Sequence, residues 1–597
     1  MTLSVLWLYN YRNSLSPFLK FTMLDNYFTY NKILYFLCRI RAKSAFKRGK
    51  KHLIHLLTKN PKLNYHIDKK TDEEILLQNI LPHRKQWKKI GKTNRYRNKY
   101  QKINSIDYNT KCIIYTVKYF QKVKPAEPFI IKLNQFISEI QNSINDPDFS
   151  FTSPEIYPKL KNKKDLTGKK KNICRPITLY NLKDKIIISQ TNKYLSELFD
   201  SEFYQYSFAF RPTKNDFRPT HHNCIKEILK YRKSFKGDEL FVAECDISKF
   251  YDSVSHDIIV SKFNKLVERV KVAKGDVDSR AISIFQCYLD SYNFVRDILP
   301  LNENPDYWST YDIPNGEFGW VKDELVKLNH YTNIDAERIG IPQGGAISGL
   351  IANIVLDYTD SVLTKGFDNL FYTRFCDDMI IIHPDLKKCE EAINSYKQAL
   401  LELKLVPHDF HECLGNDHDS FWKFKSKSPY RWSSNYLNYK YFPWIGFVGY
   451  EIHFDGNLRV RKKSLKKETK KQREVINRIE RAIRQDRRAR KGTILESATN
   501  RLIGMAVGRI QMWNHSKIDH ELCWTNGFNQ LSDNKYLSNQ LKHLDRNRNH
   551  QVAKLKKEIS KYKDTRSTDD EISRPKKKQV FYGKPFSYYF QVIDRRS

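Results

Sequence analysis

The chain has 597 residues, 40% of them hydrophobic, and Lys and Arg outnumber Asp and Glu by 105 to 67, a formal net charge of +38. At about 150 residues per domain, this length accommodates roughly three or four domains with large buried cores. So much positive charge favours a polyanionic partner, because each phosphate neutralised releases a condensed counterion. Biased codon usage is a second explanation for the abundance of Lys, Asn, Ile, Tyr and Phe.

The cysteine pattern and the hydropathy exclude several other classes. The ten cysteines form no CxxC pair and no ladder with histidines, which argues against zinc modules, iron–sulfur sites and a disulfide framework. No apolar run approaches the roughly 18 residues that cross a bilayer. Residues 1–18 are broken by polar side chains and make a poor signal peptide, and Met23 is an alternative start. We expect a soluble, intracellular protein.

The N-terminal half begins with basic segments. Residues 24–75 have a helical, basic pattern, and residues 83–102 interleave basic and aromatic side chains. Residues 145–172 are rich in Pro, Asp and Lys and are expected to form a loop. From 173 to 455, short apolar strands alternate with helical segments; the strand candidates are FVAECDI, TRFCDDMIIIH and WIGFVGYEIHF.

The C-terminal part is strongly basic. Residues 459–491 hold sixteen Lys or Arg against four Glu or Asp. Apolar residues recur there at helical spacing, which predicts an amphipathic helix with one face buried and the other free for phosphate: Val475, Ile476, Ile479 and Ile483. Residues 523–550 resemble a helical appendage, and the charged residues 551–580 are expected to be partly mobile.

A first candidate site lies in FVAECDISKFYDSVSHD, residues 241–257. An apolar strand starts at Phe241 and ends on Asp246, and Tyr251 and Asp252 follow. A lone pair of aspartates at this spacing is more often part of a solvated loop than of a site.

A second candidate is FYTRFCDDMIIIH, residues 371–383, where Asp377 and Asp378 stand between apolar flanks. Adjacent carboxylates are costly to bury in a strand, because like charges repel and both lose water. A hairpin turn would place them at a surface. If the strand carrying Asp246 lies beside this hairpin, three carboxylates converge, and hard oxygen ligands of this kind select Mg²⁺ or Mn²⁺.

A third motif lies between the first two. GIPQGGAISGLIANIVLDY, residues 340–358, contains Gly340, Gly344, Gly345 and Gly349 and then continues as an apolar helix. A glycine-rich turn before a helix suits close packing against a nucleotide, although ordinary structural turns have the same composition. Gln343 would reach a sugar or base by hydrogen bonding.

Taken together and in this order, the motifs resemble those of reverse transcriptases, particularly the bacterial kind related to group II introns and retrons. The resemblance covers roughly residues 170–520. RPITLYNLKDKIIISQ (175–190) and YSFAFRP (206–212) resemble the fingers motifs, and DISKFYD (246–252) resembles motif A. GIPQGGAISG (340–349) resembles motif B, FCDD (375–378) the YxDD motif, and FVGYEIHFDGNLRVRKKSLKK (447–467) the primer grip and thumb.

The resemblance implies an α+β, right-handed polymerase fold with helical extensions at both ends. The implied divisions are an N-terminal basic extension (1–75), fingers (76–240), palm (241–455), thumb (456–520) and a C-terminal helical, charged extension (521–597).

The same resemblance implies roles for individual residues. Two Mg²⁺ or Mn²⁺ ions would be held by Asp246, Asp377 and Asp378 with help from the Ile247 carbonyl. Tyr251 matches the aromatic steric gate that selects deoxynucleotides. The nucleotide would be bound by Gln343, Lys171 and Arg175, and the template or primer by Arg211, Gly449, Lys462 and Lys463.

The sequence departs from the family pattern at three places. Phe375 replaces the tyrosine of YxDD, and Gly349 replaces the proline that usually follows the serine, here Ser348. The lysine expected to protonate pyrophosphate is not evident in residues 403–415. His411 is the nearest match by spacing and would act as a general acid near neutral pH, and Lys404 is the alternative.

We therefore expect RNA-directed DNA synthesis from dNTPs onto a 3′-hydroxyl in the bacterial cytoplasm. The partners would be an RNA template and the hybrid duplex, with a dedicated non-coding RNA or partner protein also possible, and no membrane. The extensions resemble defence-associated, abortive-infection-like reverse transcriptases, which suggests a role against phage. The tyrosine-rich end, with Tyr582, Tyr588 and Tyr589, leaves priming on a protein hydroxyl open. The alternatives are an intron maturase or retron enzyme, and a catalytically silent RNA-binding scaffold.

Overall fold

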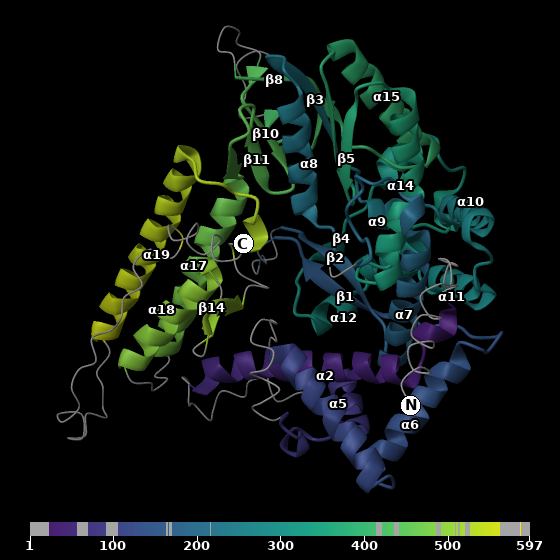
Figure 1. Ribbon diagram of the computed structural model, residues 1–597, viewed down its shortest axis with the longest axis vertical. Coiled ribbons are helices and arrows are strands. Elements are labelled where there is room, and N and C mark those ends of the chain that lie inside the picture. The colour runs from purple at the N-terminus through teal and green to yellow at the C-terminus, as the bar shows by residue number, and fades with distance from the viewer. Residues whose placement is uncertain are drawn as a thin grey trace, which may run out of the picture.

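The computed structural model describes residues 23–561 and Phe586, with gaps at 57–69, 91–104, 163–164, 166–169, 215–216, 413–420, 435–440, 485–490, 508, 512–513, 520–523 and 525. Its fold is a mixed α+β arrangement that is mostly helical. Figure 1 shows a sheet-bearing body with N-terminal helices below it and C-terminal helices along one side. The expectations for residues 1–18, most of 83–102, most of 562–580 and the three C-terminal tyrosines lie outside the described residues.

The central sheet has six strands in the order β5-β6-β3-β8-β7, with β9 also paired to β8. Their bounds are β3 Glu239–Cys245, β5 Phe371–Phe375, β6 Asp378–His383, β7 Phe410–His411, β8 Ser426–Ser433 and β9 Tyr441–Phe442. The predicted strands in FVAECDI and TRFCDDMIIIH are therefore present, the second as a tight β5–β6 hairpin. Because β6 and β8 both pair with β3, that strand lies inside the sheet.

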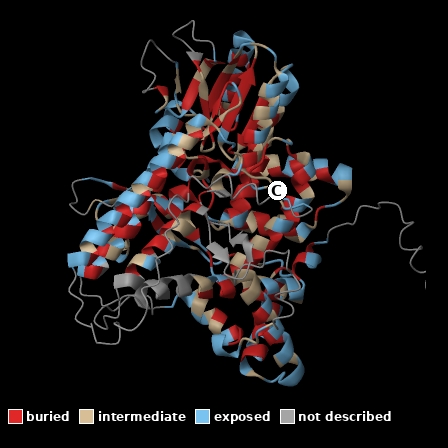
Figure 2. Cartoon of the chain, turned by 60° about the vertical axis from the view of Figure 1, so that its left-hand side comes forward, coloured by how far each residue is buried: buried red, intermediate tan, exposed pale blue. Residues whose placement is uncertain are grey.

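The two faces of this sheet belong to two different cores, and Figure 2 shows that its strands are largely buried. On one face, Ala243 and Ile381 pack with helices α7 (Leu182–Phe199), α10 (His256–Lys274), α11 (Ser279–Asp290), α14 (Ala346–Gly366) and α15 (Leu386–Glu402). On the other, Val242 and Ile380 pack with helix α8 (His221–Ser234) and a small sheet of β10 (Trp444–Phe447), β11 (Tyr450–His453) and β12 (Leu458–Val460). Burial on both faces explains the nearly continuous apolar runs of β3 and β6.

Residues 145–172 are not all loop, which corrects the expectation from composition. β1 (Glu155–Leu160) pairs antiparallel with β2 (Asn172–Leu179), and β4 (Gly316–Phe318) pairs parallel with β2. Pro158 is compatible with β1 because that strand is at the edge of the sheet, where a missing N–H costs no hydrogen bond.

Between β3 and α14, the chain forms several short elements in addition to α10, α11 and β4. They are α9 (Phe250–Ser253), η4 (Phe294–Ile298), η5 (Leu299–Glu303), α12 (Pro305–Thr310), α13 (Lys322–Lys327) and η6 (Ile334–Ala336). The buried Trp308 and Phe318 anchor this segment under the β1-β2-β4 sheet.

The described N-terminal residues are helical, as their pattern predicts. η1 (Leu24–Tyr27), α2 (Tyr30–Leu56), α3 (Asp72–Ile80), η2 (Arg84–Gln86), α5 (Ser105–Val123) and α6 (Pro128–Ser143) precede β1, with η3 (Asp200–Glu202) after α7. Tyr27 donates a hydrogen bond to Glu197 and Lys185 pairs with Glu73, so this group is joined to α7 by polar contacts as well as apolar packing.

The C-terminal helices form a separate apolar cluster. The basic helix predicted over 459–491 is α17 (Lys462–Arg484), which packs with α18 (Lys491–Val507) and α19 (Lys535–Lys561) through Val475, Ile476 and Ile483. β13 (Arg509–Gln511), β14 (Asn514–Asp519) and η7 (Asn526–Phe528) lie between α18 and α19. The appendage expected over 523–550 is helical from Lys535, and the helix continues to Lys561.

In the described part of the chain, one helix has the length and hydropathy of a membrane span. This helix is α14, and 72% of its most apolar window is buried inside the protein. Its apolar side chains meet both α10 and α15, so its hydropathy reflects a position in the core.

We predict that Gly345→Ala destabilises the fold, because an added Cβ would lie 1.8 Å from the buried Tyr288 hydroxyl. Overpacking of this kind costs about 1–3 kcal/mol. Gly366→Ala, at the other end of α14, is the matched control, since nothing lies within 4 Å of its added Cβ. Urea denaturation of both variants measures the difference; equal unfolding midpoints would contradict the prediction.

Candidate active site

The strand register brings the three predicted aspartates to one end of the sheet. Cys245 of β3 pairs with Met379 of β6, and Phe375 pairs with Asp378 across the hairpin. Asp246, the residue after β3, is therefore next to the turn that carries Asp377 and Asp378. The three carboxylates interact electrostatically: Asp246 raises the pKa of both other groups.

The carboxylates in the turn lack sufficient positive charge around them. Asp378 keeps an exposed side chain, but partial desolvation by the surrounding protein, together with Asp377 and Asp246, raises its pKa to about 7. Burial and Asp246 also raise the pKa of Asp377. Hard oxygen donors with excess negative charge suit a divalent cation such as Mg²⁺. Among the described residues, no group of three or more His, Cys, Asp or Glu side chains is closed tightly enough to hold an ion. The carboxylate oxygens fit a divalent cation chemically. To bind one, the three side chains would have to move closer together than they are in this structure.

Lys425 supplies a positive charge that sequence reasoning missed. Its Nζ lies 2.5 Å from Asp246 Oδ2 and 3.1 Å from His408 Nε2. The His408 N–H donates to the Asp246 carbonyl at 3.0 Å, which fixes that segment against the end of β3. Lys425 immediately precedes β8, the neighbour of β3, and this adjacency has no local signal in the sequence.

The ring of His411, the expected general acid, contacts an aromatic side chain. Its ring stacks on Phe424 with centroids 3.4 Å apart, and Lys404 lies over the Tyr331 ring at 4.5 Å. The backbone contacts Asp246 at His408 and then continues as β7. Three residues later, the His411 side chain contacts Phe424. His408 and Lys425 are the basic residues in contact with Asp246, and the general-acid role of His411 or Lys404 stays a prediction.

Tyr251 and the glycine-rich turn also reach this region. The Tyr251 hydroxyl lies 3.4 Å from Cys376 Sγ, in the turn before Asp377. The Ile341 N–H donates to the Tyr251 carbonyl at 2.8 Å. Gln343 donates through Nε2 to Asp252 Oδ1 at 2.5 Å, and burial raises the pKa of Asp252. The segments resembling motifs A and B and the FCDD hairpin thus meet in one place.

A group of basic side chains surrounds Asp252. Lys249 Nζ lies 3.8 Å from Asp252 Oδ2 and donates to the Gly319 carbonyl at 2.5 Å. Partial desolvation and the nearby Lys249 ammonium lower the pKa of Lys161 to about 8, and Arg175 contributes to the same effect. Two ammonium groups and a guanidinium this close attract an anion such as a phosphate. Lys161 and Lys249 were missed because basic residues are common throughout the chain.

The other predicted contact residues are dispersed. Lys171 is exposed and pairs with Glu317 at 2.9 Å. Arg211 pairs with Asp200 and donates to the Tyr204 and Ser207 carbonyls at 3.0 Å, so its guanidinium supports the fold and is not presented to a template. Gly449, with φ +93°, forms the turn between β10 and β11.

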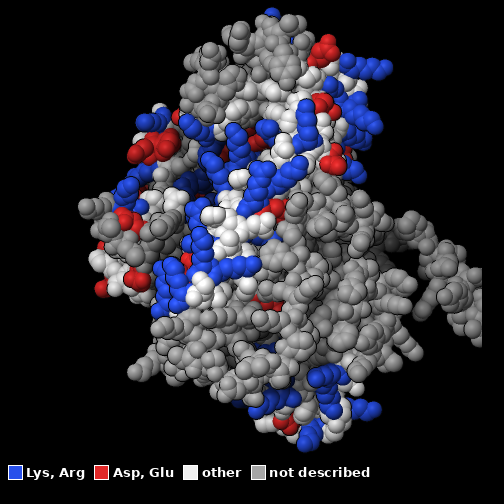
Figure 3. Space-filling model, turned by 90° about the vertical axis from the view of Figure 1, so that its left-hand side faces the viewer, with Lys and Arg blue, Asp and Glu red and all other residues white. Residues whose placement is uncertain are grey.

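Lys462 and Lys463 belong to the exposed side of α17. Figure 3 shows Lys and Arg side chains gathered on the side of the molecule where α17, α18 and α19 lie. The exposed basic residues of α17 are Lys462, Lys463, Lys466, Lys467, Lys470, Lys471, Arg473, Arg478, Arg481 and Arg484. This surface has the charge and length of a polyanion-binding face.

Comparison with known families identifies the class of this domain. Residues 297–408 match the family described as reverse transcriptase (RNA-dependent DNA polymerase). The match includes the glycine-rich turn and the β5–β6 hairpin with both of its aspartates, but not Asp246. Residues 297–408 thus carry the sequence of a reverse transcriptase (RNA-dependent DNA polymerase) family domain, which supports the family-level resemblance for this segment.

The curated relatives are distant. LtrA, a group II intron-encoded protein of Lactococcus lactis, is 23% identical over 240 residues, covering 40% of this chain and 31% of LtrA. YkfC of Escherichia coli is 20% identical over 259 residues, 38% of this chain and 55% of YkfC. The COX1/OXI3 intron 1 protein of Saccharomyces cerevisiae is 24% identical over 237 residues, 40% of this chain and 22% of that protein. The chain thus matches between about a fifth and a half of these relatives.

Among solved structures, telomerase from Candida albicans with a fragment of telomeric RNA aligns with 81% of this chain and 77% of its own. The identity is 12% and the TM-score is 0.29.

His256 joins the glycine-rich turn to the segment after Asp246. Its Nε2 donates to the Gly340 carbonyl at 2.7 Å, and no partner is found for its Nδ1 among the described residues. A second proton on this ring would have no acceptor, and burial lowers the pKa of His256 to about 4.

We predict that His256 makes the protein less stable in mild acid. The unfolded chain takes up this proton near pH 6.5 and the folded chain only near pH 4, so stability is lost as the pH falls through that interval. The full effect is about 3 kcal/mol. Urea denaturation above pH 6.5 and near pH 4 should show a smaller pH effect in His256→Gln than in the wild type, and an unchanged pH effect would contradict this assignment.

Proposed function

We propose that this protein is an RNA-directed DNA polymerase that adds deoxynucleotides from dNTPs to a 3′-hydroxyl. The supporting observation concerns three aspartates. Asp377 and Asp378 lie inside the segment that matches the reverse transcriptase family, and Asp246, which lies outside that segment, lies beside them because of the strand register. On this proposal the central sheet is the palm, the β1-β2-β4 sheet belongs to the fingers, and α17 with α18 and α19 forms the thumb and its extension.

The proposed metal ligands are Asp246, Asp377 and Asp378, assisted by the Ile247 carbonyl. Two Mg²⁺ or Mn²⁺ ions, when bound there, would activate the attacking hydroxyl and stabilise the leaving pyrophosphate. Lys425 holds Asp246 at the end of β3, and its ammonium lies where it would limit repulsion among the carboxylates.

The proposed nucleotide site is between the two sheets. Lys161, Lys249 and Arg175 would contact the triphosphate, and the Tyr251 ring would lie under the sugar. Gln343 is held by Asp252 at the edge of this region, within reach of the same nucleotide. The exposed basic side of α17 would follow the backbone of the RNA–DNA hybrid by charge.

We also propose, on the resemblance of the long extensions, that the protein acts in the bacterial cytoplasm in defence against phage, with a protein hydroxyl as a possible primer. Phage plating on cells that express wild-type protein or Asp377→Asn tests the defence role. The similarity to intron-encoded proteins favours a second candidate function, in which the protein acts as a maturase on a dedicated intron RNA. Sequencing the RNA that copurifies with the protein distinguishes these roles.

We predict that Asp377→Asn and Asp246→Asn each reduce Mg²⁺-dependent primer extension by about 100- to 1,000-fold. Each removes a carboxylate charge that would hold a metal worth several kcal/mol to the reaction. Asp276→Asn is the control, because that side chain is 82% exposed and pairs with Lys271 away from the site. Wild-type protein without dNTP incorporation on any primed RNA would support the RNA-binding scaffold instead.

We predict that Tyr251→Ala increases ribonucleotide use relative to deoxynucleotide use by about 10-fold or more, because the ring would no longer meet a 2′-hydroxyl. Tyr251→Phe keeps the ring and loses the contact to Cys376, so its discrimination should match the wild type. Single-nucleotide extension with paired dNTP and rNTP series gives both ratios. Unchanged selectivity in Tyr251→Ala would exclude this residue as the steric gate.

A further inference from the structure

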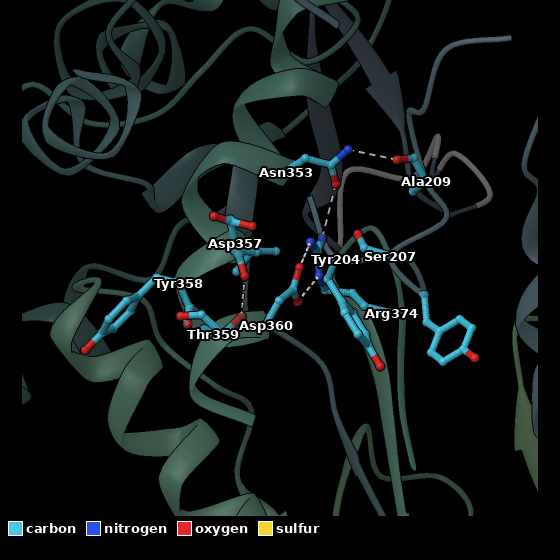
Figure 4. Close-up of polar contacts among 12 residues, drawn as sticks. Tyr204, Ser207, Ala209, Asn353, Asp357, Tyr358, Thr359, Asp360 and Arg374 are labelled. Carbon is cyan, nitrogen blue, oxygen red and sulfur yellow. Dashed lines mark hydrogen bonds and ion pairs between the residues drawn. The ribbon is translucent and has the colours of Figure 1, made fainter. Parts of the chain in front are cut away.

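Arg374 is a fully buried charge one residue from the end of β5. Its guanidinium forms a two-pronged ion pair with Asp360 of α14, with Nη2–Oδ2 at 2.6 Å and Nε–Oδ1 at 2.9 Å (Figure 4). The Tyr372 hydroxyl also donates to Asp360 Oδ1, at 2.7 Å. Both charges are paired, as full burial requires.

The remaining guanidinium nitrogen points toward the turn. Arg374 Nη1 donates to the Cys376 carbonyl at 3.0 Å and to Asn353 Oδ1 at 3.3 Å. Asn353 in turn donates through Nδ2 to the Ala209 carbonyl at 2.9 Å. The planar Arg374 side chain therefore connects the hairpin turn to helix α14, and through Asn353 it is linked to Ala209 in the segment before α8 (Figure 4).

The anchored carbonyl belongs to a residue in an unfavourable backbone conformation. Cys376 has φ +63°, in the left-handed region that non-glycine residues rarely occupy, and it directly precedes Asp377 and Asp378. Such a conformation persists when surrounding contacts determine it. The donor from Arg374 is one of these contacts, and the Tyr251 hydroxyl beside Cys376 Sγ is another.

We propose that Arg374 is a positioning residue for the metal-binding carboxylates: it holds the Cys376 turn so that Asp377 and Asp378 face Asp246. The proposal rests on the metal site of the proposed function and deepens it. A buried ion pair is a weak source of stability, since desolvation offsets most of the attraction, so a positional role explains its presence better. The role needs arginine, because lysine cannot satisfy Asp360 and the Cys376 carbonyl with one planar fork.

The decisive variant is Arg374→Lys, which keeps the charge opposite Asp360 and loses the fork. Arg269→Lys is the matched control: Arg269 pairs with Asp357 on the same helix at 2.9 Å but is partly exposed and is not bonded to the turn. The full-length proteins are titrated with Mn²⁺, and binding is followed by electron paramagnetic resonance, which needs no polymerase activity. Hydrogen exchange of the peptide covering residues 371–383 reports on the turn directly.

We expect Arg374→Lys to weaken Mn²⁺ binding by about 10- to 100-fold, the usual effect of losing a group that orients a metal ligand. Exchange at the turn should accelerate, and Arg269→Lys should match the wild type in both measurements. If Arg374→Lys does not fold, the pair Arg374→Gln with Asp360→Asn removes both buried charges together and should show the same loss. Mn²⁺ affinity within twofold of wild type in a folded variant, or no Mn²⁺ binding by the wild type, would overturn the proposal.

Primer extension separates this proposal from the proposed function. A lower kcat with an unchanged KM for dNTP is expected in Arg374→Lys, because the turn would be misplaced while the nucleotide contacts stay. If the wild type binds Mn²⁺ and Arg374→Lys does not, but neither makes DNA, the polymerase proposal fails and the positioning role stands.

Discussion

Three carboxylates at the end of a buried sheet repel one another, and most of the surrounding structure limits that repulsion. Partial desolvation by the surrounding protein and the neighbouring aspartates raise the pKa of Asp378 to about 7, so the charged form is costly at this position. Lys425 lowers the pKa of Asp377, and Arg461 lowers that of Asp378, but neither offsets the effect of desolvation. The three carboxylates therefore carry excess negative charge that apolar packing cannot neutralise. A divalent cation bound by their oxygens would neutralise it.

The sheet is what keeps these groups together despite their repulsion. Its apolar side chains alternate between two separate cores, so a shift of one residue in β3 or β6 would move every one of them to the wrong face. The register that pairs Cys245 with Met379 is therefore fixed by burial along the whole strand, not by the aspartates. The free energy that keeps the carboxylates close together comes from burial of the apolar residues of β3 and β6.

The elements of the fold that could be predicted from the sequence are those formed by local apolar patterns, while contacts between distant segments could not be predicted. Strands β3, β5 and β6, the glycine-rich turn into α14 and the basic helix α17 were predicted because each carries its own local pattern of apolar residues. β1 was missed because it lies within residues 145–172, whose Pro, Asp and Lys content is typical of a loop, and one proline interrupts its own apolar residues. Lys425 and Lys161 could not be assigned, because their importance depends on tertiary proximity to Asp246 and Lys249, and 105 basic residues give no means of choosing. The general-acid role of His411 stays a prediction, because spacing along the chain does not show which side chains His408 and His411 meet on either side of the start of β7.

Two of the nine non-glycine residues with positive φ in the described chain lie beside the carboxylates. Lys249 and Cys376, both non-glycine residues with left-handed φ of +54° and +63°, follow β3 and β5 and stand three residues after Asp246 and one before Asp377. Gly340 and Gly344, with φ of +87° and +108°, turn the third segment toward them. Each of these turns has a specific contact: Lys249 donates to the Gly319 carbonyl, Arg374 donates to the Cys376 carbonyl, and His256 donates to the Gly340 carbonyl. The left-handed φ is unfavourable for Lys249 and Cys376 but not for the glycines, so the contacts at those two residues are the ones that hold a costly backbone conformation next to Asp246 and Asp377.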